Sequence, residues 1–475
     1  MIPLEPIAPK APARNGHGTG EVHLKTMVCY LALSVIGLPV VARASDLFRL
    51  LPGDYEAAQA RVDLIQQATW EIEASYYEIG NDRIAAMFLS LLRDAALRHV
   101  TVRLIVDAEH NDIPAEVQAM LLGAGVRIRE FHPNSVAHPK WCNLRMHDKV
   151  LIVDREQMVV GSRNMLNPHF GLDQVNFIDR DAYLRGEVVQ QAHRYYTCLW
   201  NSDEVRDTNL KDNFWQKLKH KDKLSLDRVG LCEACAKSLS QTCKAIRWLG
   251  AGRCVSICCR PIEFCTCNDW SACAVEICCA WFIYDSCGRK RQQGCIYDQL
   301  LSLIRQAKAS IVLETPYFLL SGELREALFD ARARGVQVMV FTNSLASTNK
   351  IEVTAILTNQ RRRLLRHSVE LWEYAGPNHL HAKSMVVDGS TAFVGSFNFD
   401  PRSELLNTET GVVVRDPHVA EWVLESIDDH LQNAFPIGSD GQSVIHGVRN
   451  PGASRARILL MQPIRIFAPA IRRLL

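Results

Sequence analysis

Residues 147–164 read HDKVLIVDREQMVVGSRN, and residues 381–398 read HAKSMVVDGSTAFVGSFN. Each stretch places a lysine two residues after a histidine, an aspartate after an apolar run, and Gly-Ser-x-Asn at the far end. The second stretch follows the first by 234 residues and keeps the same spacing. Chance does not account for two copies that agree at so many positions, so the chain contains an internal repeat.

The residues upstream of these stretches repeat as well. Leu64–Ala68 matches Leu303–Ala307, and the β-branched run 100–107 matches 336–341. Apolar residues at helical spacing precede short β-branched runs, so each half is predicted to read helix, strand, helix, strand, helix, strand. Such alternation is typical of a mixed β-sheet flanked by helices. The sequence therefore predicts an α/β fold of two fused domains, with the active site at the interface between the two copies.

The polar residues of the two signatures are suited to holding a phosphate. In a strand, side chains two positions apart share a face, so each histidine points the same way as its lysine. Lysine is costly to bury without an anionic partner, and amide and cationic donors together bind a phosphate. One histidine, one lysine and one asparagine from each half are expected to converge there: His147, Lys149 and Asn164, with His381, Lys383 and Asn398.

Bulk composition excludes two broad classes of protein. The chain has 475 residues, 48% of them hydrophobic and 22% charged, so it can form a sizeable core and is not mainly disordered. Fifty-four Lys and Arg against 52 Asp and Glu leave a net charge of +2, too small to indicate a nucleic-acid partner. The basic runs 361–363 and 217–223 are interpreted as solvated helix faces.

The second signature continues into residues that carry a family resemblance. Gly395–Ser403 with Leu406–Glu409, together with Glu314–Phe318 and Thr342–Ala346, resembles the phospholipase D superfamily, and within it the C-type branch of the bacterial cardiolipin synthases. The resemblance covers residues from about 50 to 205 and from about 280 to 435.

The resemblance implies a covalent mechanism that needs neither a metal nor a cofactor. It makes His147 the nucleophile that forms a phosphohistidine and His381 the acid and base, although the two near-equivalent motifs do not order them. The lysines and asparagines would neutralise the phosphate oxygens. The family pattern assigns Glu409 and Asp181 as the acids that orient the histidines, and Ser162 and Ser396 as hydrogen-bond donors near the phosphate.

The aspartates of the two signatures, Asp154 and Asp388, complete the catalytic motif. Each lies five residues past its lysine, beyond the apolar strand. We therefore interpret them as structural salt-bridge anchors rather than proton donors.

The expected reaction is phosphatidyl transfer that makes cardiolipin from phosphatidylglycerol and a second phospholipid, phosphatidylglycerol or phosphatidylethanolamine. A hydrolase that uses water as acceptor needs the same residues and stays an alternative, as does, more remotely, a nuclease or phosphodiesterase. The expected partners are phospholipids and a membrane surface, with no nucleic acid. The expected location is the bacterial inner membrane, in a leaflet that the sequence does not decide.

Both ends of the chain support a membrane association. Residues 27–41 are apolar and end in Ala42-Arg43-Ala44, which fits either a signal peptide or a membrane-associated helix. Residues 441–475 hold six arginines and no acidic residue, interleaved with apolar side chains, a composition that suits an anionic membrane surface.

Thirteen of the 16 cysteines lie between Cys232 and Cys295. The pair Cys232-x-x-Cys235 has zinc-ligand spacing but no partner pair, so no metal site is expected. A divergent insert, a cysteine-rich module and a stretch read in a shifted frame stay open. The predicted organisation is an N-terminal segment (1–45), a first domain (46–210), a cysteine-rich insert (211–282), a second domain (283–435) and a basic tail (436–475).

Overall fold

The structure is a computed structural model that describes residues 45–132, 143–208, 269–285, 296–441, 444–445 and 448–471. These residues belong to one compact unit, which spans Ser45–Leu475. The predicted N-terminal segment, apart from its last residue, and most of the cysteine-rich insert lie outside the described residues. Within the described part, no helix is both long and apolar enough to span a bilayer.

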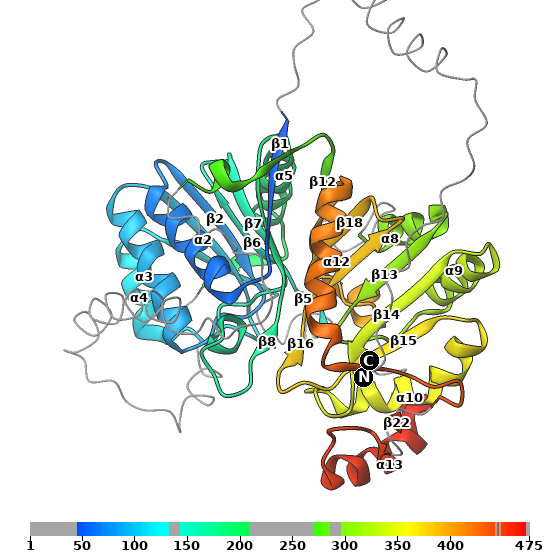
Figure 1. Ribbon diagram of the computed structural model, residues 1–475. Helices are drawn as coiled ribbons and strands as arrows, with labels where there is room; N and C mark the ends of the chain where they lie inside the picture. The colour runs from blue at the N-terminus through cyan, green and yellow to red at the C-terminus, as the bar shows by residue number, and fades with distance from the viewer. Residues whose placement is uncertain are drawn as a thin grey trace, which may run out of the picture. The chain divides into compact units, whose positions relative to one another are not determined.

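The first half begins with strand β1, which lies between β9 and β11 in its sheet, and then alternates helices and strands as the sequence predicts (Figure 1). Its elements are β1 (Asp46–Leu51), α2 (Asp54–Gln67), β2 (Glu71–Tyr76), α3 (Arg83–Leu97), β3 (Thr101–Asp107), α4 (Ala115–Gly123), β4 (Arg127–Phe131), β5 (Arg145–Met146), β6 (Lys149–Val153), β7 (Gln157–Gly161), the 3-10 helix η2 (Asn167–Phe170), β8 (Phe177–Ile178), β9 (Asp181–Arg185), α5 (Glu187–Trp200) and β10 (Val205–Asp207).

From β12 to β21 the second half repeats the same order of elements, and η3 and β11 precede this repeat. Its elements are η3 (Trp270–Cys273), β11 (Val275–Ile277), β12 (Ala280–Tyr284), α8 (Ile296–Gln306), β13 (Ser310–Glu314), α9 (Gly322–Ala333), β14 (Gln337–Asn343), α10 (Ile351–Arg366), β15 (Glu370–Tyr374), β16 (His379–Leu380), β17 (Ser384–Val387), β18 (Thr391–Gly395), α11 (Pro401–Leu405), β19 (Asn407–Thr408), β20 (Thr410–Arg415), α12 (Pro417–Leu431), β21 (Ala434–Pro436), β22 (Val444–Ile445), β23 (Val448–Arg449) and α13 (Arg455–Ile471).

Two large mixed sheets correspond in strand order, except that the first has β11 as an additional edge strand. The first runs β10-β4-β3-β2-β6-β7-β9-β1-β11, and the second runs β12-β20-β18-β17-β13-β14-β15-β21. In each, three parallel strands, β2-β3-β4 and β13-β14-β15, continue into antiparallel strands that carry the polar signature. The predicted α/β fold with two repeated domains is confirmed.

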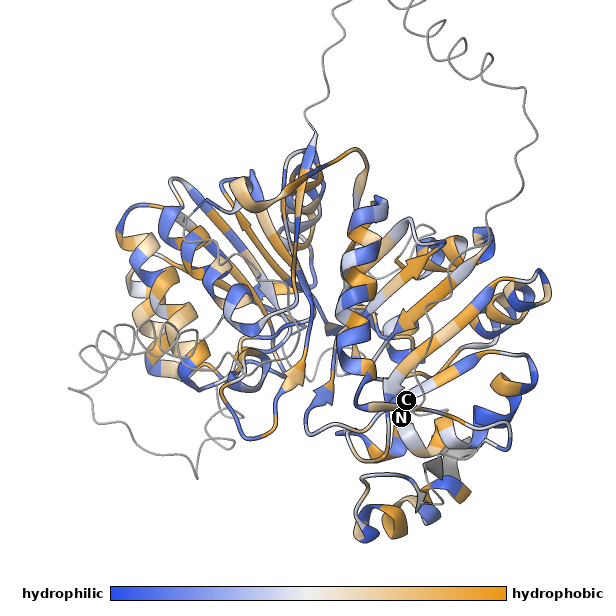
Figure 2. Ribbon diagram, viewed as in Figure 1, coloured by the Kyte–Doolittle hydropathy of each residue, from blue (hydrophilic) through white to orange (hydrophobic). Residues whose placement is uncertain are grey.

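Buried apolar residues explain why these segments form sheets covered by helices. β6 and β17 are buried along their whole length, which only strands inside a covered sheet can be. Figure 2 shows the strands as mainly hydrophobic, whereas the helices carry both hydrophobic and hydrophilic residues. One buried cluster belongs to each half, and a third contains residues of both halves, among them Phe48, Ile152, Phe341 and Val414. This shared cluster joins the two copies.

The motif aspartates anchor backbone rather than cations, which corrects the predicted salt-bridge role. Asp154 accepts hydrogen bonds from the amides of Thr69, Trp70 and Glu71 at 2.8–2.9 Å. Asp388 accepts from the amides of 308–310 at 2.7–3.1 Å. Each therefore fixes the turn that enters the central strand of its sheet. Neither carboxylate contacts the motif histidines, so the catalytic assignment of these two residues is wrong.

Two predicted boundaries fall inside ordered structure. β11 pairs with β1, and β12 pairs with β20, so strands begin again before residue 283, where the insert was expected to end. β12 comes directly after Cys278 and Cys279, so it was counted with the cysteine-rich insert. At the other end, α13 packs on α10, with Met461 buried against Leu345 and Ala355. Much of the tail therefore forms part of the folded unit.

Candidate active site

At the site, short strands of one half pair with short strands of the other half. β5 pairs in parallel with β19 of the other half, and β16 pairs in parallel with β8. The main chain continues both pairings into the motif histidines: His147 N donates to Thr408 O at 2.9 Å, and His381 N donates to Ile178 O at 2.8 Å. Each histidine is therefore positioned by backbone of the opposite copy.

His147 is bonded to an acid from the second half. Its Nδ1 lies 2.8 Å from Oε2 of Glu409, which has no exposed side-chain surface. The same Glu409 accepts hydrogen bonds from Ser396, Ser403 and Asn407 at 2.5–3.0 Å. Burial raises the pKa of Glu409 to about 7, against the opposing effects of Lys149 and these donors. The predicted role of Glu409 as an orienting acid agrees with this geometry.

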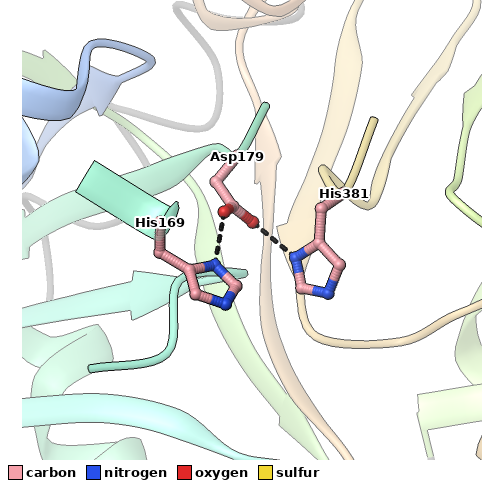
Figure 3. A group of neighbouring side chains, drawn as sticks. All are labelled: His169, Asp179 and His381. Atoms are coloured by element: carbon pink, nitrogen blue, oxygen red, sulfur yellow. Dashed lines mark hydrogen bonds and ion pairs between the residues drawn. The ribbon is translucent and has the colours of Figure 1, made fainter. Parts of the chain in front are cut away.

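His381 is bonded to an acid from the first half, and that acid is Asp179 (Figure 3). Nδ1 of His381 lies 2.7 Å from Oδ1 of Asp179, and Nδ1 of His169 lies 2.6 Å from its Oδ2. Burial alone would raise the pKa of Asp179, but the two histidines hold it well below its usual range. A single buried carboxylate thus serves two imidazoles.

The predicted orienting role of Asp181 is wrong. Asp181 forms buried ion pairs with Arg61 at 2.9 Å and with Arg163 at 3.3 Å, and it contacts neither motif histidine. The backbone explains the shift by two residues: Ser162 N bonds to Arg180 O as Ser396 N bonds to Thr410 O. The residue before each of these carbonyls, Asp179 or Glu409, is therefore the equivalent acid.

The two signature serines serve the acids and not a phosphate. Ser162 Oγ donates to Asp179 Oδ1 at 2.6 Å, and Ser396 Oγ donates to Glu409 Oε2 at 2.5 Å. Each hydroxyl has one proton to donate, and a carboxylate takes it. Their prediction as phosphate ligands is therefore wrong, and they act as supports that fix the carboxylates.

Glycine precedes each serine because the backbone of the neighbouring strand approaches closely. A Cβ on Gly161 would lie 2.5 Å from the carbonyl oxygen of Arg180, and one on Gly395 would lie 2.5 Å from that of Thr410. Side chains cannot occupy this space without moving the strand. The glycines thus permit the strand pairing that places the acids.

Both lysines are completely buried beside the histidines. Lys383 Nζ lies 3.0 Å from Nε2 of His381, and Lys149 Nζ lies 4.9 Å from the centre of the Tyr77 ring. Burial lowers the pKa of Lys149 to about 8 and that of Lys383 to about 7, although the acids of the site act in the opposite direction. Among the described residues, neither ammonium forms an ion pair with a carboxylate, so both can bind an anion at close range.

The electrostatics of the site keep the histidines neutral in the free protein. Burial, followed by the charges of Lys149 and Lys383, lowers the pKa of His147 well below its usual value. Burial and then Lys383 lower the pKa of His381, against the effect of Asp179. With Nδ1–H donated to an acid, each neutral imidazole carries its lone pair on Nε2, which is the form a nucleophile or base requires.

The asparagines reach the same space. Asn164 and Asn398 are buried, and within the described part of the chain neither side-chain oxygen has a hydrogen-bond partner. Nδ2 of Asn164 lies 3.4 Å from Nε2 of His169. The Nδ2 groups of these side chains, and not their oxygens, are the donors that can bind phosphate oxygens beside the two ammonium groups.

Sequence reasoning missed three residues of the site. Asp179 was passed over for Asp181, and neither His169 nor Tyr77 was singled out. The ring of Tyr77 lies 4.8 Å from that of His147, and its hydroxyl bonds to His110 at 2.6 Å. One signal for His169 was present: it lies five residues after Asn164, as Ser403 lies after Asn398.

Two clusters of the described residues bring three potential metal ligands together. They are His169, Asp179 and His381, and Glu71, Glu73 and His193. In the first, the N to O distances of 2.6 and 2.7 Å are those of hydrogen bonds and are shorter than the roughly 3.3 Å between ligands of a tetrahedral zinc. In the second, Arg103 already pairs with both glutamates. Both clusters are built as hydrogen-bonded or ion-paired networks.

The duplicated fold and its site define an enzyme of the phospholipase D class, with two histidine and lysine pairs around one anion site. The sequence family described as cardiolipin synthase, phospholipase D-like domain matches residues 62–200 and 300–431. Because that match covers more than half of the 475 residues, the chain belongs to this family of phospholipid-modifying enzymes.

Known proteins resemble the chain over most of its length. Cardiolipin synthase C of Escherichia coli is 26% identical over 401 residues, covering 78% of this chain and 81% of that protein. An uncharacterised protein of Helicobacter pylori is 24% identical over 82% of this chain and 80% of its own length. The crystal structure of phosphatidylserine synthase from Haemophilus influenzae has a TM-score of 0.62 at 14% identity, covering 95% and 98% of the two chains, which is a likeness of fold.

Proposed function

We propose that the protein is a phosphatidyltransferase that makes cardiolipin from phosphatidylglycerol and a second phospholipid. The observation that carries the proposal is the crossed pairing of each histidine with an acid of the opposite half, beside two buried lysines. Membership of the cardiolipin synthase family and the likeness to cardiolipin synthase C support the choice of a lipid phosphodiester.

The reaction proceeds in two displacements at phosphorus. In the first, Nε2 of His147 attacks the phosphorus of phosphatidylglycerol, an N–P bond forms, and the P–O bond to the headgroup glycerol breaks. A protonated His381 gives its Nε2 proton to the departing oxygen. In the second, His381 takes the proton of the acceptor alcohol, whose oxygen displaces His147 and regenerates its lone pair. The lysines and the asparagine amides stabilise the negative charge of both transition states.

The contacts of the two histidines support this division of roles. Within the described residues, Nε2 of His147 has no hydrogen bond, so its lone pair is available to a phosphorus atom. Nε2 of His381 instead lies 3.0 Å from the Lys383 ammonium, a group that can supply or share a proton. His147 therefore suits the nucleophile and His381 suits the acid and base.

Lipid analysis tests the reaction. A bacterial strain without cardiolipin synthase would express the intact chain, His147→Ala or His381→Ala, and its lipids would be separated by mass. Cardiolipin is expected only with the intact chain. Formation of phosphatidic acid instead would establish hydrolysis, and inert lipids would refute the proposal. Purified His381→Ala should accumulate a phosphatidyl adduct on residue 147, detected by peptide mass; an adduct found in His147→Ala would reverse the roles.

The membrane surface is proposed to lie against α13. This helix packs one face on α10 but leaves Leu459, Leu460 and Ile466 exposed to 71%, 55% and 75%. No acidic residue occurs from 441 to 475, whereas six arginines do, so the segment complements anionic phospholipids. The proposed location is the bacterial inner membrane, where such lipids are the substrates.

Vesicle binding tests that surface. The chain and Leu459→Asp/Leu460→Asp would be sedimented with vesicles of phosphatidylglycerol and phosphatidylcholine in equal parts. The double variant is expected to bind about tenfold more weakly, because two exposed apolar side chains no longer enter the bilayer. Leu405→Asp, at another exposed leucine, is the matched control. Equal binding of all three proteins would contradict the role of α13.

A further inference from the structure

The two halves of the active site differ at one position that supports an acid. His169 lies five residues after Asn164, and Ser403 lies five residues after Asn398, so the two occupy the same place in the repeat. Both donate to the second oxygen of the acid: His169 to Oδ2 of Asp179 at 2.6 Å, and Ser403 to Oε1 of Glu409 at 2.6 Å. The first half thus has an ionisable group where the second has a neutral hydroxyl.

His169 is built firmly into this position. Its ring stacks on Phe177 with a centroid distance of 4.6 Å, and its residue is only 2% exposed. The ring centre lies 5.1 Å from that of His381. The guanidinium of Arg163 binds its main-chain oxygen at 3.0 Å. A histidine that only filled space would not need a buried carboxylate in common with a second histidine.

The charged groups around the two rings differ. His169 faces Asp179, Asp54 from α2 and Glu78 from the loop after β2, with Arg163 and His381 as the cationic or ionisable neighbours. His381 faces Asp179, but the Lys383 ammonium lies 3.0 Å from its Nε2. Two protonated imidazoles on one carboxylate repel each other, so a charge on His169 opposes the protonation of His381.

We propose that His169 is a positioning residue that sets the protonation of His381 through their common partner, Asp179. A charge on His169 makes His381 a stronger acid toward the leaving alcohol, and its Nδ1–H keeps Oδ1 of Asp179 directed at His381. The effect of His169 on the protonation of His381 is a property of the free protein. Only the catalytic consequence of that effect rests on the proposed function.

Two substitutions separate the charge from the hydrogen bond. His169→Asn keeps an amide donor near the position of Nδ1 but cannot be charged. His169→Phe keeps the ring stacked on Phe177 but removes both the donor and the charge. His193→Asn is the matched control, because His193 pairs with Glu73 at 2.9 Å in the same half and shares no hydrogen bond with the site residues.

The titration of His381 is measured by NMR in ligand-free protein labelled with ¹³C-histidine, with the signal assigned by its loss in His381→Ala. In His169→Asn and His169→Phe the midpoint is expected to rise by about one pH unit, since the ionisable ring that opposes protonation of His381 is gone. His193→Asn should titrate as the unmodified chain. A midpoint that stays in place in His169→Asn overturns the proposal.

A second readout keeps the two proposals apart. The alkaline limb of the pH–rate profile for lipid transfer should move to higher pH in His169→Asn, and His169→Phe should also lose about tenfold in rate because Asp179 is no longer held. A moved NMR midpoint without any lipid turnover would refute the proposed function alone. Turnover with an unmoved alkaline limb and midpoint would refute only the role of His169.

Discussion

Arg180 of the first half and Glu314 of the second form a buried ion pair between the two copies, with 1% and 0% of their side chains exposed. The guanidinium also donates to Ser384 at 2.7 Å and to Ser426 at 2.8 Å. Arg180 therefore connects the segment that leads into β9 with β13, β17 and α12 of the second half. Arg180 follows Asp179 directly, so this pair also fixes the backbone that presents the acid of His381.

Arg180→Met should destabilise the protein by about 3–5 kcal/mol, because it leaves the Glu314 charge buried without a partner. Urea denaturation followed by circular dichroism measures the loss. The double variant Arg180→Met/Glu314→Leu removes both charges and should regain most of it. A single variant as stable as the unmodified chain would show that the pair is not buried in solution.

Glu409→Gln should lower the rate of lipid turnover by about 10²–10⁴-fold, because the amide no longer fixes the tautomer of His147 or stabilises its positive charge. The free energy of unfolding should change little, because Ser396, Ser403 and Asn407 remain within hydrogen-bond distance of the Gln side chain and the serine hydroxyls can donate or accept. Steady-state turnover of mixed vesicles measures the rate. A loss below tenfold would contradict the role of Glu409.

Asp179→Asn and Asp181→Asn should have opposite consequences. Asp179→Asn should lower turnover by at least about 10²-fold, because His381 loses its acid. Asp181→Asn should instead lower stability by about 3 kcal/mol, because Arg61 and Arg163 lose a buried counter-charge. Thermal unfolding and turnover are measured for both proteins, and the reverse pattern would restore Asp181 as the orienting acid.

Asp154→Asn and Asp388→Asn should each cost about 1–2 kcal/mol at pH 7, since a carboxylate that accepts several amide hydrogens is lost. Burial alone would raise the pKa of both carboxyls, but the amides hold it below the usual value. A lowered pKa stabilises the fold above the unfolded value of about 3.9 and loses this contribution as the pH falls through the folded value.

The stability difference from the unmodified chain should therefore be full at pH 7 and shrink below about pH 4. Urea denaturation at several pH values measures it. Turnover by the folded fraction should persist in both variants. Abolished turnover at unchanged stability would return these aspartates to the catalytic group.

Anion binding should weaken as the pH rises, because only the protonated lysines attract an anion. The pKa of Lys383 is about 7 and that of Lys149 about 8, both lowered by burial. Sulfate keeps its charge from pH 6 to 9, and its affinity should fall about tenfold or more over that range. Calorimetry measures the affinity. Lys383→Met should bind weakly at every pH, whereas the exposed Lys308→Met should behave as the unmodified chain; a flat profile would contradict the lowered values.

Local pattern sufficed for the fold and for the motif residues. Helical spacing followed by β-branched runs predicted the three parallel strands of each half, and the repeat of His-x-Lys and Gly-Ser-x-Asn predicted the two halves of the site. The spacing between Asn164 and Asp179 differs from that between Asn398 and Glu409, so counting along the chain does not find Asp179. Only the strand pairing of Ser162 with Arg180 reveals the equivalent acid.

The roles of Ser162, Ser396, Asp154 and Asp388 depend on what lies across the sheet. A serine beside a phosphate motif and an aspartate after a buried strand look the same in sequence whether they meet a ligand, a cation or backbone amides. Their hydrogen-bond partners lie 13 to 85 residues away along the chain; Glu409 is 13 residues from Ser396, and Thr69 is 85 residues from Asp154. No local pattern could therefore identify these partners.

The exchange of acids between the copies has a consequence for how such a duplicated protein can diverge. Each motif histidine is bonded to a carboxylate of the other copy. A substitution of the acid in one copy therefore acts first on the histidine of the other copy. Either half alone would keep its motif histidine but would lose the carboxylate that binds Nδ1 of that histidine. The two copies have already diverged at one such position, where an imidazole (His169) supports the acid of the first copy and a hydroxyl (Ser403) supports that of the second. Each copy still needs the acid of the other.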